Sequence, residues 1–241
     1  MSPIIDFHSH ILPEMDDGSA SVDESIAMLR TMAEQGITHV VSTPHFYAAY
    51  DQPDRFLARR DRAEALLRTE MEKYSGLPTL LVGAEVFYFR GMCDSEFLNL
   101  LTIKNGSCIM VEMPESVWHP YMFRELTEIY QRHKLVPVIA HIDRYISKFR
   151  NRTLPEKLAS LPVAVQANAS FFLNRSSAGF ALSMLRKGLI HVLGSDCHNM
   201  SSRSPNLGNA VDVISDRLGA DTVHSVNGNA CELLGISFST I

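Results

Sequence analysis

The sequence has few cysteines, no long apolar run and no excess of basic residues. The cysteines form no C-x-x-C pair, which argues against a zinc ribbon or a redox motif; they are Cys93, Cys108, Cys197 and Cys231. No apolar run approaches the roughly 18 residues of a membrane span, and no basic segment followed by an apolar stretch marks a signal peptide. The formal net charge of −5 gives no support to a nucleic-acid partner. We therefore expect a cytoplasmic protein that neither inserts into a membrane nor binds nucleic acid.

The sequence also lacks a linker, a repeat or a low-complexity segment that would divide it. Hydrophobic residues make up 46% of the 241 positions and charged residues 20%, which is ordinary for a globular protein. A chain of this size can bury a core without disulfides, and α/β barrels of roughly 200–250 residues commonly form one unit. We expect residues 1–241 to form a single domain.

Short apolar runs alternate along the chain with segments of helical periodicity. The predicted strands lie at residues 4–7, 38–45, 79–85, 108–113, 136–141, 163–168 and 191–196. A capping box of Ser21 and Glu24 opens a predicted helix that ends at Gly36. Further helices are predicted at residues 55–74, 121–133, 178–187 and 209–218. Apolar strands separated by helices indicate a parallel sheet covered on both faces, and seven such units favour a closed or nearly closed β/α barrel over an open doubly wound sheet.

Residue types that bind metals follow the predicted strands. They are His8, His10, His45, Glu85, Glu112, His141, Asn168, Asp196 and His198. In a β/α barrel the carboxyl ends of all strands open on one face, where active sites lie. A single histidine or glutamate is more often a structural or solvent-facing residue. Because five of the ten histidines occur in this set, we expect one shared site.

Imidazoles mixed with carboxylates are typical ligands of zinc, iron and manganese, and carboxylates favour manganese. Eight or nine ligands exceed what one ion uses, so two or three ions that share bridging carboxylates fit better. Such a cluster binds a phosphoryl oxygen and turns a bound water into hydroxide near neutral pH. The rival is a nucleophilic Cys197 beside His198. Because side chains alternate along an extended segment, we expect Cys197 to point away from the site.

Further candidates lie close to these residues. Asp16 and Asp17 follow the first two histidines, and the spacing does not decide which of them is a ligand, although we favour Asp16. Arg144 follows His141, and Arg203 follows His198. A guanidinium is a natural bidentate partner of phosphate, although each arginine could equally be a surface residue. Arg90 is a weaker candidate of the same kind.

The motifs "DFHSHILPEMDDG", "STPH", "GAEV", "VEM", "VIAHIDRY" and "GSDCHN" resemble those of the PHP (polymerase and histidinol phosphatase) superfamily. They look most like the bacterial metal-dependent tyrosine-protein phosphatases of capsule and exopolysaccharide clusters, the CpsB type. The resemblance runs from His8 to about Arg203. The pattern H-x-H alone is found throughout metal hydrolases, whereas the longer opening motif is specific to this branch.

The resemblance implies a distorted (β/α)7 TIM-like barrel of the PHP type with a trinuclear site that usually prefers manganese, although iron or zinc could serve. The implied ligands are His8, His10, Asp16, His45, Glu85, Glu112, His141, Asp196 and His198, with Glu85 as the bridge between ions. Arg144 and Arg203 match the family's substrate-facing arginines. One departure is Asp143 in "HIDRY", where relatives often carry glutamate.

These observations lead to the hypothesis of phosphomonoester hydrolysis, in which metal-bound hydroxide attacks phosphorus and Arg144 and Arg203 neutralise the developing charge. The resemblance implies a phosphotyrosine protein as substrate, namely a tyrosine autokinase that controls polysaccharide export. The alternatives are a small-molecule phosphatase, such as a histidinol phosphatase, and a non-catalytic metal-stabilised partner of the export machinery. A nuclease fits the acidic chain poorly. The sequence leaves the native metal and the oligomeric state open.

Overall fold

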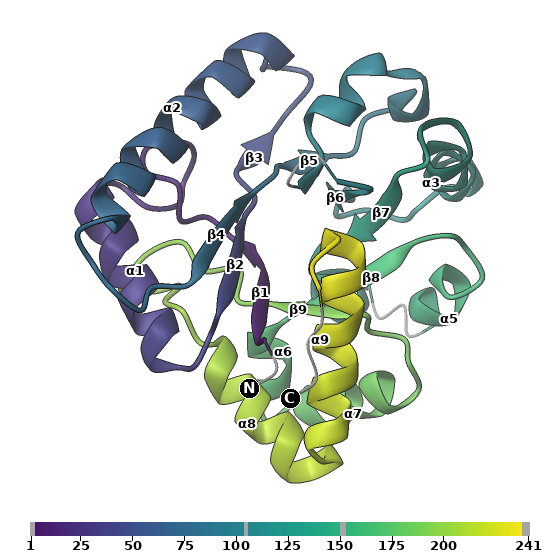
Figure 1. The fold of residues 1–241 in the computed structure, drawn as a ribbon. Helices are drawn as coiled ribbons and strands as arrows, with labels where there is room; N and C mark the ends of the chain where they lie inside the picture. Colours follow the sequence, from purple (N-terminus) through teal and green to yellow (C-terminus); the bar gives the residue numbers. More distant parts are fainter. Residues whose placement is uncertain (1–2, 104–105, 150–152, 238–241) are drawn as a thin grey trace.

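The strands form a curled, all-parallel sheet in the computed structural model, which describes residues 3–103, 106–149 and 153–237 (Figure 1). One part of the sheet has the order β1 (Ile5–Ser9), β2 (His39–Ser42), β4 (Thr79–Val82). The other part has the order β3 (His45–Phe46), β5 (Glu85–Phe87), β6 (Cys108–Glu112), β7 (Val136–Ile139), β8 (Ala164–Asn168), β9 (Val192–Gly194). The prediction of a parallel α/β fold is confirmed.

Two of the predicted strands are interrupted, which explains why more strands are observed than were predicted. The range 38–45 becomes β2 and β3, and the range 79–85 becomes β4 and β5. Pro44 lies at the first interruption and cannot donate a ladder hydrogen bond. The ladder resumes directly afterwards, because Glu85 N donates to Pro44 O at 3.0 Å. Each pair of pieces therefore continues one path through the sheet.

The two ends of the curled sheet also meet. Backbone hydrogen bonds join β1 to the segment after β9, from Asp196 N to His8 O at 2.8 Å and from His10 N to Cys197 O at 2.9 Å. Strand β1 therefore has β2 on one side and the end of β9 on the other. This contact brings the histidines of the first strand beside the last predicted ligands.

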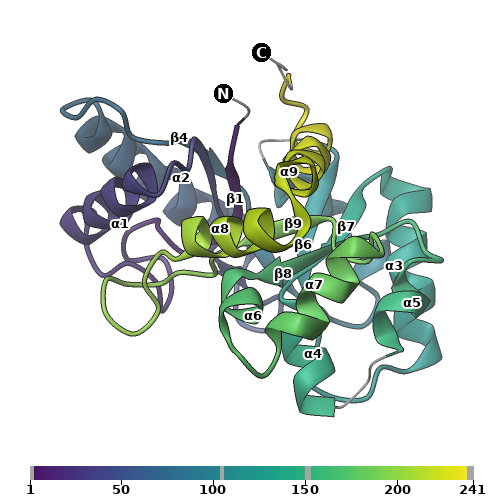
Figure 2. The ribbon, with the colours of Figure 1, turned by 90° about the horizontal axis from the view of Figure 1, so that it is seen from below.

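Helices surround the outside of the curled sheet, with α1 and α2 on one side and α3, α5 and α7 on the other (Figures 1 and 2). Their bounds are α1 (Val22–Glu34), α2 (Pro53–Met71), α3 (Pro120–His133), α4 (Ile142–Phe149), α5 (Leu154–Leu158), α6 (Ala169–Leu173), α7 (Ala178–Arg186), α8 (Leu207–Leu218) and α9 (Ala220–Leu234). Short 3-10 helices lie at η1 (Met92–Asp94) and η2 (Glu96–Leu100). As predicted, Ser21 caps α1 and accepts a hydrogen bond from Glu24 N at 3.1 Å. No helix in the described residues is long and apolar enough to cross a membrane.

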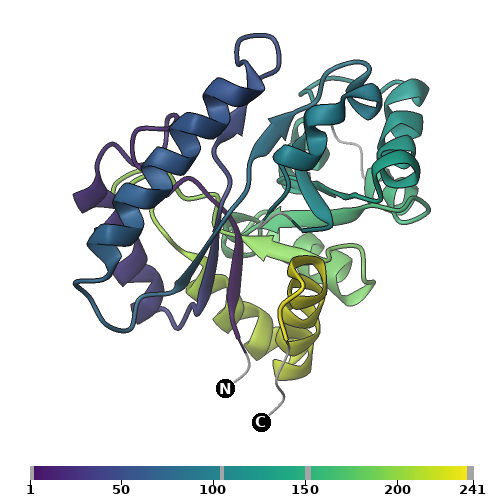
Figure 3. The ribbon, with the colours of Figure 1, turned by 45° about the horizontal axis from the view of Figure 1, so that its top comes forward.

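A separate apolar cluster fills the inside of the curl. Phe7, Val41, Met110 and Val138 belong to it, together with the α9 residues Ala230, Cys231 and Leu234. Helix α9 lies beside β9 (Figure 3) and donates from Asn229 Nδ2 to His191 O, just before that strand, at 3.1 Å. The helix therefore covers the amino ends of the strands and leaves their carboxyl ends open for a site.

Candidate metal centre

Glu85 lies at the centre of a buried group of histidines from several strands. Its Oε2 atom is 3.2 Å from His8 Nε2, 3.3 Å from His10 Nε2 and 3.1 Å from His45 Nδ1. Its Oε1 atom is 2.8 Å from His141 Nε2. Side chains of β1, β3 and β5 thus converge with those of residues just after β1 and β7, as the sequence predicted.

Three overlapping groups of possible ligands occur in the described part of the chain, and the ligand atoms within each lie within 4.8 Å of one another. They are His10, Asp17, His45 and His198; His8, His10 and Glu85; and His45, Glu85 and Glu112. Asp196 joins the second group, because its Oδ1 atom is 3.6 Å from both His8 Nε2 and His10 Nε2. His141 Nε2 lies 3.4 Å from Glu112 Oε1. Shared members link all three groups into one cluster.

A β-bulge in β1 turns His8 toward this cluster. Between the pairs that Asp6 and Ser9 make with β2, β1 has two intervening residues and β2 has one. The extra residue allows Phe7 to join the inner apolar cluster while the adjacent His8 faces the ligands. Bulges commonly redirect a side chain next to an active site, and here the bulge supplies the first histidine.

Asp6 stabilises the irregular backbone around the bulge. Its fully buried carboxylate accepts hydrogen bonds from His8 N at 3.3 Å and from Ser195 N at 2.8 Å. Burial raises the pKa of Asp6 to about 6, and these hydrogen bonds oppose the rise. Asp6 therefore ties β1 to the end of β9 directly behind the site.

Polar partners fix which ring nitrogen of several histidines faces the cluster. His8 Nδ1 donates to Gln166 Oε1 at 3.2 Å, and His198 Nδ1 donates to Asp196 O at 3.0 Å. The Nε2 atoms then carry the lone pairs, as metal-binding histidines require. The buried His198 Nε2 atom has no hydrogen-bond partner among the described residues, so these side chains fit a cation.

The two adjacent aspartates have different positions. Asp17 Oδ1 lies 3.4 Å from His198 Nε2 and 3.6 Å from His45 Nε2. Asp16 instead lies behind His10, where Oδ2 accepts from His10 Nδ1 at 2.8 Å and from His45 N at 2.9 Å. The preference for Asp16 as a ligand thus needs correction. Because its oxygens already accept these hydrogen bonds, the geometry favours Asp17 as the ligand and Asp16 as the residue that orients His10.

The carboxylates of the cluster favour positive charge on the histidines around them. Burial alone would lower the pKa of His10, but Asp16 and Glu85 outweigh burial and raise it to about 10. In the same way Glu112 and Glu85 outweigh burial and raise the pKa of His141 to about 9. The surrounding histidines hold the pKa of Glu85 well below its usual range in spite of burial. The carboxylates therefore favour positive charge at the site.

Arg144 and Arg203 lie beside the cluster and share Asp196. Arg144 Nη2 donates to Asp196 Oδ2, and Arg203 Nη2 donates to Asp196 Oδ1 at 2.8 Å. Their side chains remain 31% and 36% exposed, so both can reach a solvent-borne ligand. They line a cavity of about 310 Å³ together with Ser195, Ser202 and other polar residues. Arg90 lies elsewhere, 5.2 Å from the ring centre of Tyr121.

Two predicted ligands have strained backbones. His141 has a φ of 31° and Asp196 a φ of 53°, in the region that residues other than glycine rarely adopt. Such strain persists only where surrounding contacts fix it, and it clusters at functional sites. Cys197, next to Asp196, is buried, and burial raises the pKa of its thiol well above the ordinary range. It therefore lacks the features of an activated nucleophile.

An aromatic pair lies at the edge of the cluster. Tyr47 comes two residues after His45, and Phe87 two residues after Glu85, so alternation along each strand directs them to the same face. The ring centres of Tyr47 and Phe87 are 5.6 Å apart, and that of Tyr47 is 5.4 Å from that of His45. Both side chains are partly exposed, so they offer an apolar wall beside the ligands.

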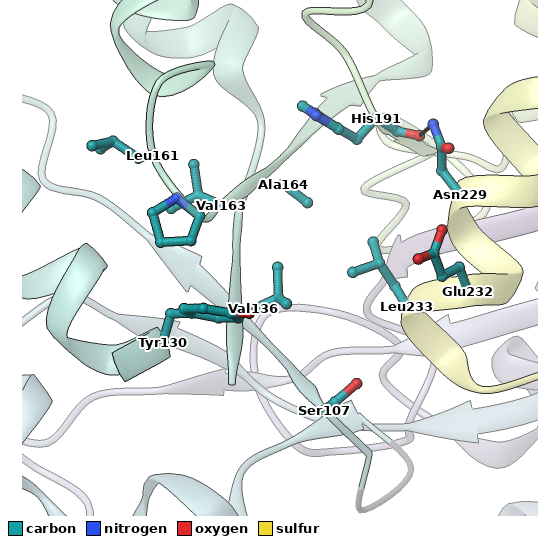
Figure 4. A pocket seen from close by; sticks show the side chains of 11 residues that line it. Ser107, Tyr130, Val136, Leu161, Val163, Ala164, His191, Asn229, Glu232 and Leu233 are labelled. Carbon is teal, nitrogen blue, oxygen red and sulfur yellow. Dashed lines mark hydrogen bonds between the residues drawn. The ribbon is translucent and has the colours of Figure 1, made fainter. Parts of the chain in front are cut away.

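A different cavity, of about 380 Å³, lies at the opposite end of the strands (Figure 4). Val136 at the start of β7 and Ala164 at the start of β8 line it, together with Leu233 of α9. None of its lining residues belongs to the predicted ligand set. The carboxyl end of the sheet is therefore the candidate active face.

A sequence profile for capsular polysaccharide synthesis, CpsB/CapC, matches residues 4–234. The chain belongs to the CpsB/CapC family. Tyrosine-protein phosphatase YwqE of Bacillus subtilis (strain 168) is 30% identical over 237 residues, which cover 96% of this chain and 91% of YwqE. Tyrosine-protein phosphatase CpsB of Streptococcus pneumoniae is 27% identical over 227 residues, which cover 90% of this chain and 92% of CpsB.

Solved structures agree with this family assignment. A chain from the crystal structures of YwqE from Bacillus subtilis and CpsB from Streptococcus pneumoniae, described as unique metal-dependent tyrosine phosphatases, matches with a TM-score of 0.83 and 25% identity. The match covers 98% of this chain and 96% of that one. A lactonase from Listeria monocytogenes, at 10% identity and a TM-score of 0.58, shares the fold alone; the match covers 99% of this chain and 95% of that one.

Some residues of this CpsB/CapC protein that contact the candidate ligands are not predicted from the sequence. Asp6 and Gln166 were assigned no role, although each is a polar residue inside an apolar strand, and Asn168 was noted only for its position. A buried polar residue in such a run is informative, because burial without hydrogen bonds is costly. That signal could have identified Asp6 and Gln166.

Proposed function

We propose that this chain is a metal-dependent phosphomonoester hydrolase that removes phosphate from tyrosine in proteins. The observation that carries the proposal is the linked cluster of ligand atoms around Glu85, with Arg144 and Arg203 beside it. The relatives YwqE and CpsB are named tyrosine-protein phosphatases, which supports the same activity here. The match to a metal-dependent tyrosine phosphatase along nearly the whole chain supports the dependence on metal.

We propose two or three divalent ions, with manganese as the first candidate because carboxylates are numerous among the ligands. The ligands would be His8, His10, Asp17, His45, Glu85, Glu112, His141, Asp196 and His198. Glu85 would bridge ions, since its two oxygens face different histidines. When bound, divalent ions in such a site polarise phosphoryl oxygens and lower the pKa of a coordinated water.

The two arginines would bind the oxygens of the substrate's phosphoryl group. Each guanidinium is held by Asp196 and partly exposed, so its remaining N–H groups can face a phosphate in the adjoining cavity. A guanidinium in a fixed position stabilises the charge that develops on the phosphoryl group during transfer. Arg144 and Arg203 would thus orient the substrate and stabilise the transition state.

The aromatic pair of Tyr47 and Phe87 supports an aryl phosphate as substrate. Aromatic rings at the edge of the ligand cluster can stack on the phenyl group of phosphotyrosine, whereas they give an alkyl phosphate little contact. The substrate protein would be a tyrosine autokinase of polysaccharide synthesis, in keeping with the family's description.

We also propose that the curled sheet is the distorted (β/α)7 barrel of the PHP type and that the chain forms one domain. The hydrogen bonds between β1 and the segment after β9 support closure of the sheet. The packing of α9 against both β1 and β9 supports one folding unit, because it joins the two ends of the chain.

Purified protein tests the proposed function directly. Metals per chain should be measured first, followed by turnover of a phosphotyrosyl peptide with added manganese and with a chelator. We expect bound metal, turnover with manganese and loss of turnover with the chelator. Full activity in metal-depleted protein would overturn the mechanism, and a clear preference for histidinol phosphate would overturn the substrate.

A further inference from the structure

Gln166 lies fully buried in β8 and contacts two proposed ligands from other parts of the fold. Its Oε1 atom accepts hydrogen bonds from His141 N at 2.6 Å and from His8 Nδ1 at 3.2 Å. Its Nε2 atom donates to Asn168 Oδ1 at 3.0 Å. One amide therefore connects β1, β8 and the end of β7 behind the cluster.

The partners of Gln166 determine how its amide is oriented. A backbone N–H can only donate, so the atom that faces His141 N must be the oxygen. The same oxygen faces His8 Nδ1, which must then carry a proton. In neutral His8 the lone pair therefore lies on Nε2, the atom that is 3.2 Å from Glu85 Oε2.

The same amide also fixes a strained turn. The short hydrogen bond from His141 N holds the residue whose φ is 31°. Without this acceptor the N–H of His141 would be buried and unpaired, which is unfavourable. Gln166 thus favours the backbone conformation that directs His141 toward Glu85.

The hydrogen-bonded chain extends to a third proposed ligand. Asn168 Nδ2 donates to Asp196 Oδ2 at 3.0 Å, while Asn168 Oδ1 accepts from Gln166. Gly194 leaves room for this arrangement, because a Cβ atom there would lie 3.0 Å from Gln166 Nε2. Each side-chain polar atom of Gln166 and Asn168 has a partner, so rotation of the Gln166 amide would break several hydrogen bonds together.

We propose that Gln166 is a positioning residue that sets the tautomer of His8 and holds the turn at His141, so that both face Glu85. This inference rests on the proposed metal centre but concerns metal affinity rather than the substrate. Residues that orient metal-binding histidines commonly change metal affinity by about 10- to 100-fold when replaced. Gln166 acts through the ligands and need not touch the substrate.

Two substitutions and a matched control test the proposal. Gln166→Met removes all three hydrogen bonds at similar volume, whereas Gln166→Glu keeps an acceptor for His8 and His141. The control is Asn227→Leu, which removes another buried amide, at the amino end of β1, where Asn227 Oδ1 accepts from Ile5 N at 2.9 Å. The control separates general destabilisation from an effect on the site.

The measurements are manganese affinity, by titration of metal-free protein, and the His8 tautomer, by ¹⁵N NMR of the same protein. We expect Gln166→Met to weaken affinity about 10- to 100-fold and to reduce protonation of His8 at Nδ1. Gln166→Glu should keep the Nδ1–H tautomer and bind manganese more tightly than Gln166→Met. Asn227→Leu should keep the wild-type affinity.

Affinity of Gln166→Met within about threefold of wild type would overturn the inference. An equal loss in Asn227→Leu would also overturn it, because general destabilisation would then explain both. If Gln166→Met fails to fold, Gln166→Glu still tests the inference. Loss of the Nδ1–H tautomer of His8 in Gln166→Glu would contradict it. Wild-type protein that binds manganese but does not hydrolyse phosphotyrosine would refute the proposed function and leave this test intact.

Discussion

Glu85 shows how one residue can unite a site that is dispersed along the sequence. Its two oxygens face His8 and His10 from β1 and the residue after it, His45 from β3, and His141 from just after β7. The residue is only 1% exposed, so its charge is screened little by water. A carboxylate in this position is stable because the surrounding positive charge offsets its burial.

The adjacent aspartates allow a prediction at the scale of single residues. Asp17→Asn should lower the number of metals per chain, because it removes a charged ligand atom beside His45 and His198. Asp16→Asn should retain the number of metals but bind them about 10- to 100-fold more weakly, because one amide oxygen cannot accept all of the hydrogen bonds of the carboxylate. Elemental analysis and metal titration measure both effects. The reverse order of effects would restore Asp16 as the ligand.

The arginines give a second prediction at this scale. Arg203→Lys should lower kcat/KM for a phosphotyrosyl peptide about 100-fold or more, because lysine keeps the charge but loses the forked geometry. Metals per chain should remain unchanged. Arg90→Lys is the matched control and should keep wild-type kinetics, since Arg90 lies over Tyr121. Equal effects of the two substitutions would contradict the assignment of Arg203.

Most residues of the candidate cluster could be predicted because metal ligands must be histidines or carboxylates and because strand ends are recognisable. Which of Asp16 and Asp17 is the ligand could not be predicted, since adjacent residues in a loop have no periodicity that fixes which one points inward. The role of Gln166 could not be predicted either, because the function of a side-chain amide depends on its hydrogen-bond partners.

At the scale of elements, the bulge in β1 explains why the alternation of its side chains is misleading. Strict alternation would direct Phe7 and His8 to opposite faces, yet the extra residue turns both inward. The interruptions at β2/β3 and β4/β5 were likewise hidden in runs that read as continuous strands. Such irregularities depend on the neighbouring strand, so a single sequence predicts the strands but not the irregularities.

The contact between β1 and β9 leads to a prediction about glycine. A Cβ atom at Gly194 would lie 2.5 Å from His8 Cβ, so Gly194→Ala should displace His8, lower metal affinity and destabilise the fold by about 1–3 kcal/mol. Gly179→Ala is the control, because a Cβ there meets open space in α7. Thermal unfolding and metal titration measure the effects. Wild-type metal affinity in Gly194→Ala would show that the strands can separate without cost.

The aromatic edge of β3 and β5 gives a prediction about specificity. Tyr47→Ala should raise KM for a phosphotyrosyl peptide roughly 2- to 10-fold, which corresponds to the loss of one aromatic contact. KM for glycerol phosphate should not change, because that substrate has no ring. Tyr50→Ala, in the same loop at a side chain that is 87% exposed, is the control. An equal change of KM for both substrates would remove the case for an aryl pocket.

At the scale of the whole molecule, the site depends on contacts between the two ends of the chain. His8 lies in the first strand and His10 directly after it, whereas Asp196 and His198 follow the last strand, yet their side chains lie within a few ångströms. Helix α9 packs on the same two strands from their amino ends. The sequence alone does not indicate where this helix packs, because the apolar face of a helix does not specify which surface it covers.

This arrangement predicts that metal stabilises the entire fold. Ligands from β1, β3, β5 and β6 and from the segments after β1, β7 and β9 would be joined through bound ions, which cannot bind the unfolded chain in the same way. At a free metal concentration about 100 times Kd, binding adds roughly 2.7 kcal/mol, or about 5–10 °C in Tm for a chain of this size. In calorimetry, a chelator should lower the Tm by this amount, and excess manganese should then restore it. Asp17→Asn should show a smaller difference, and an unchanged Tm in wild-type protein would show that the ligand cluster forms equally well without ions.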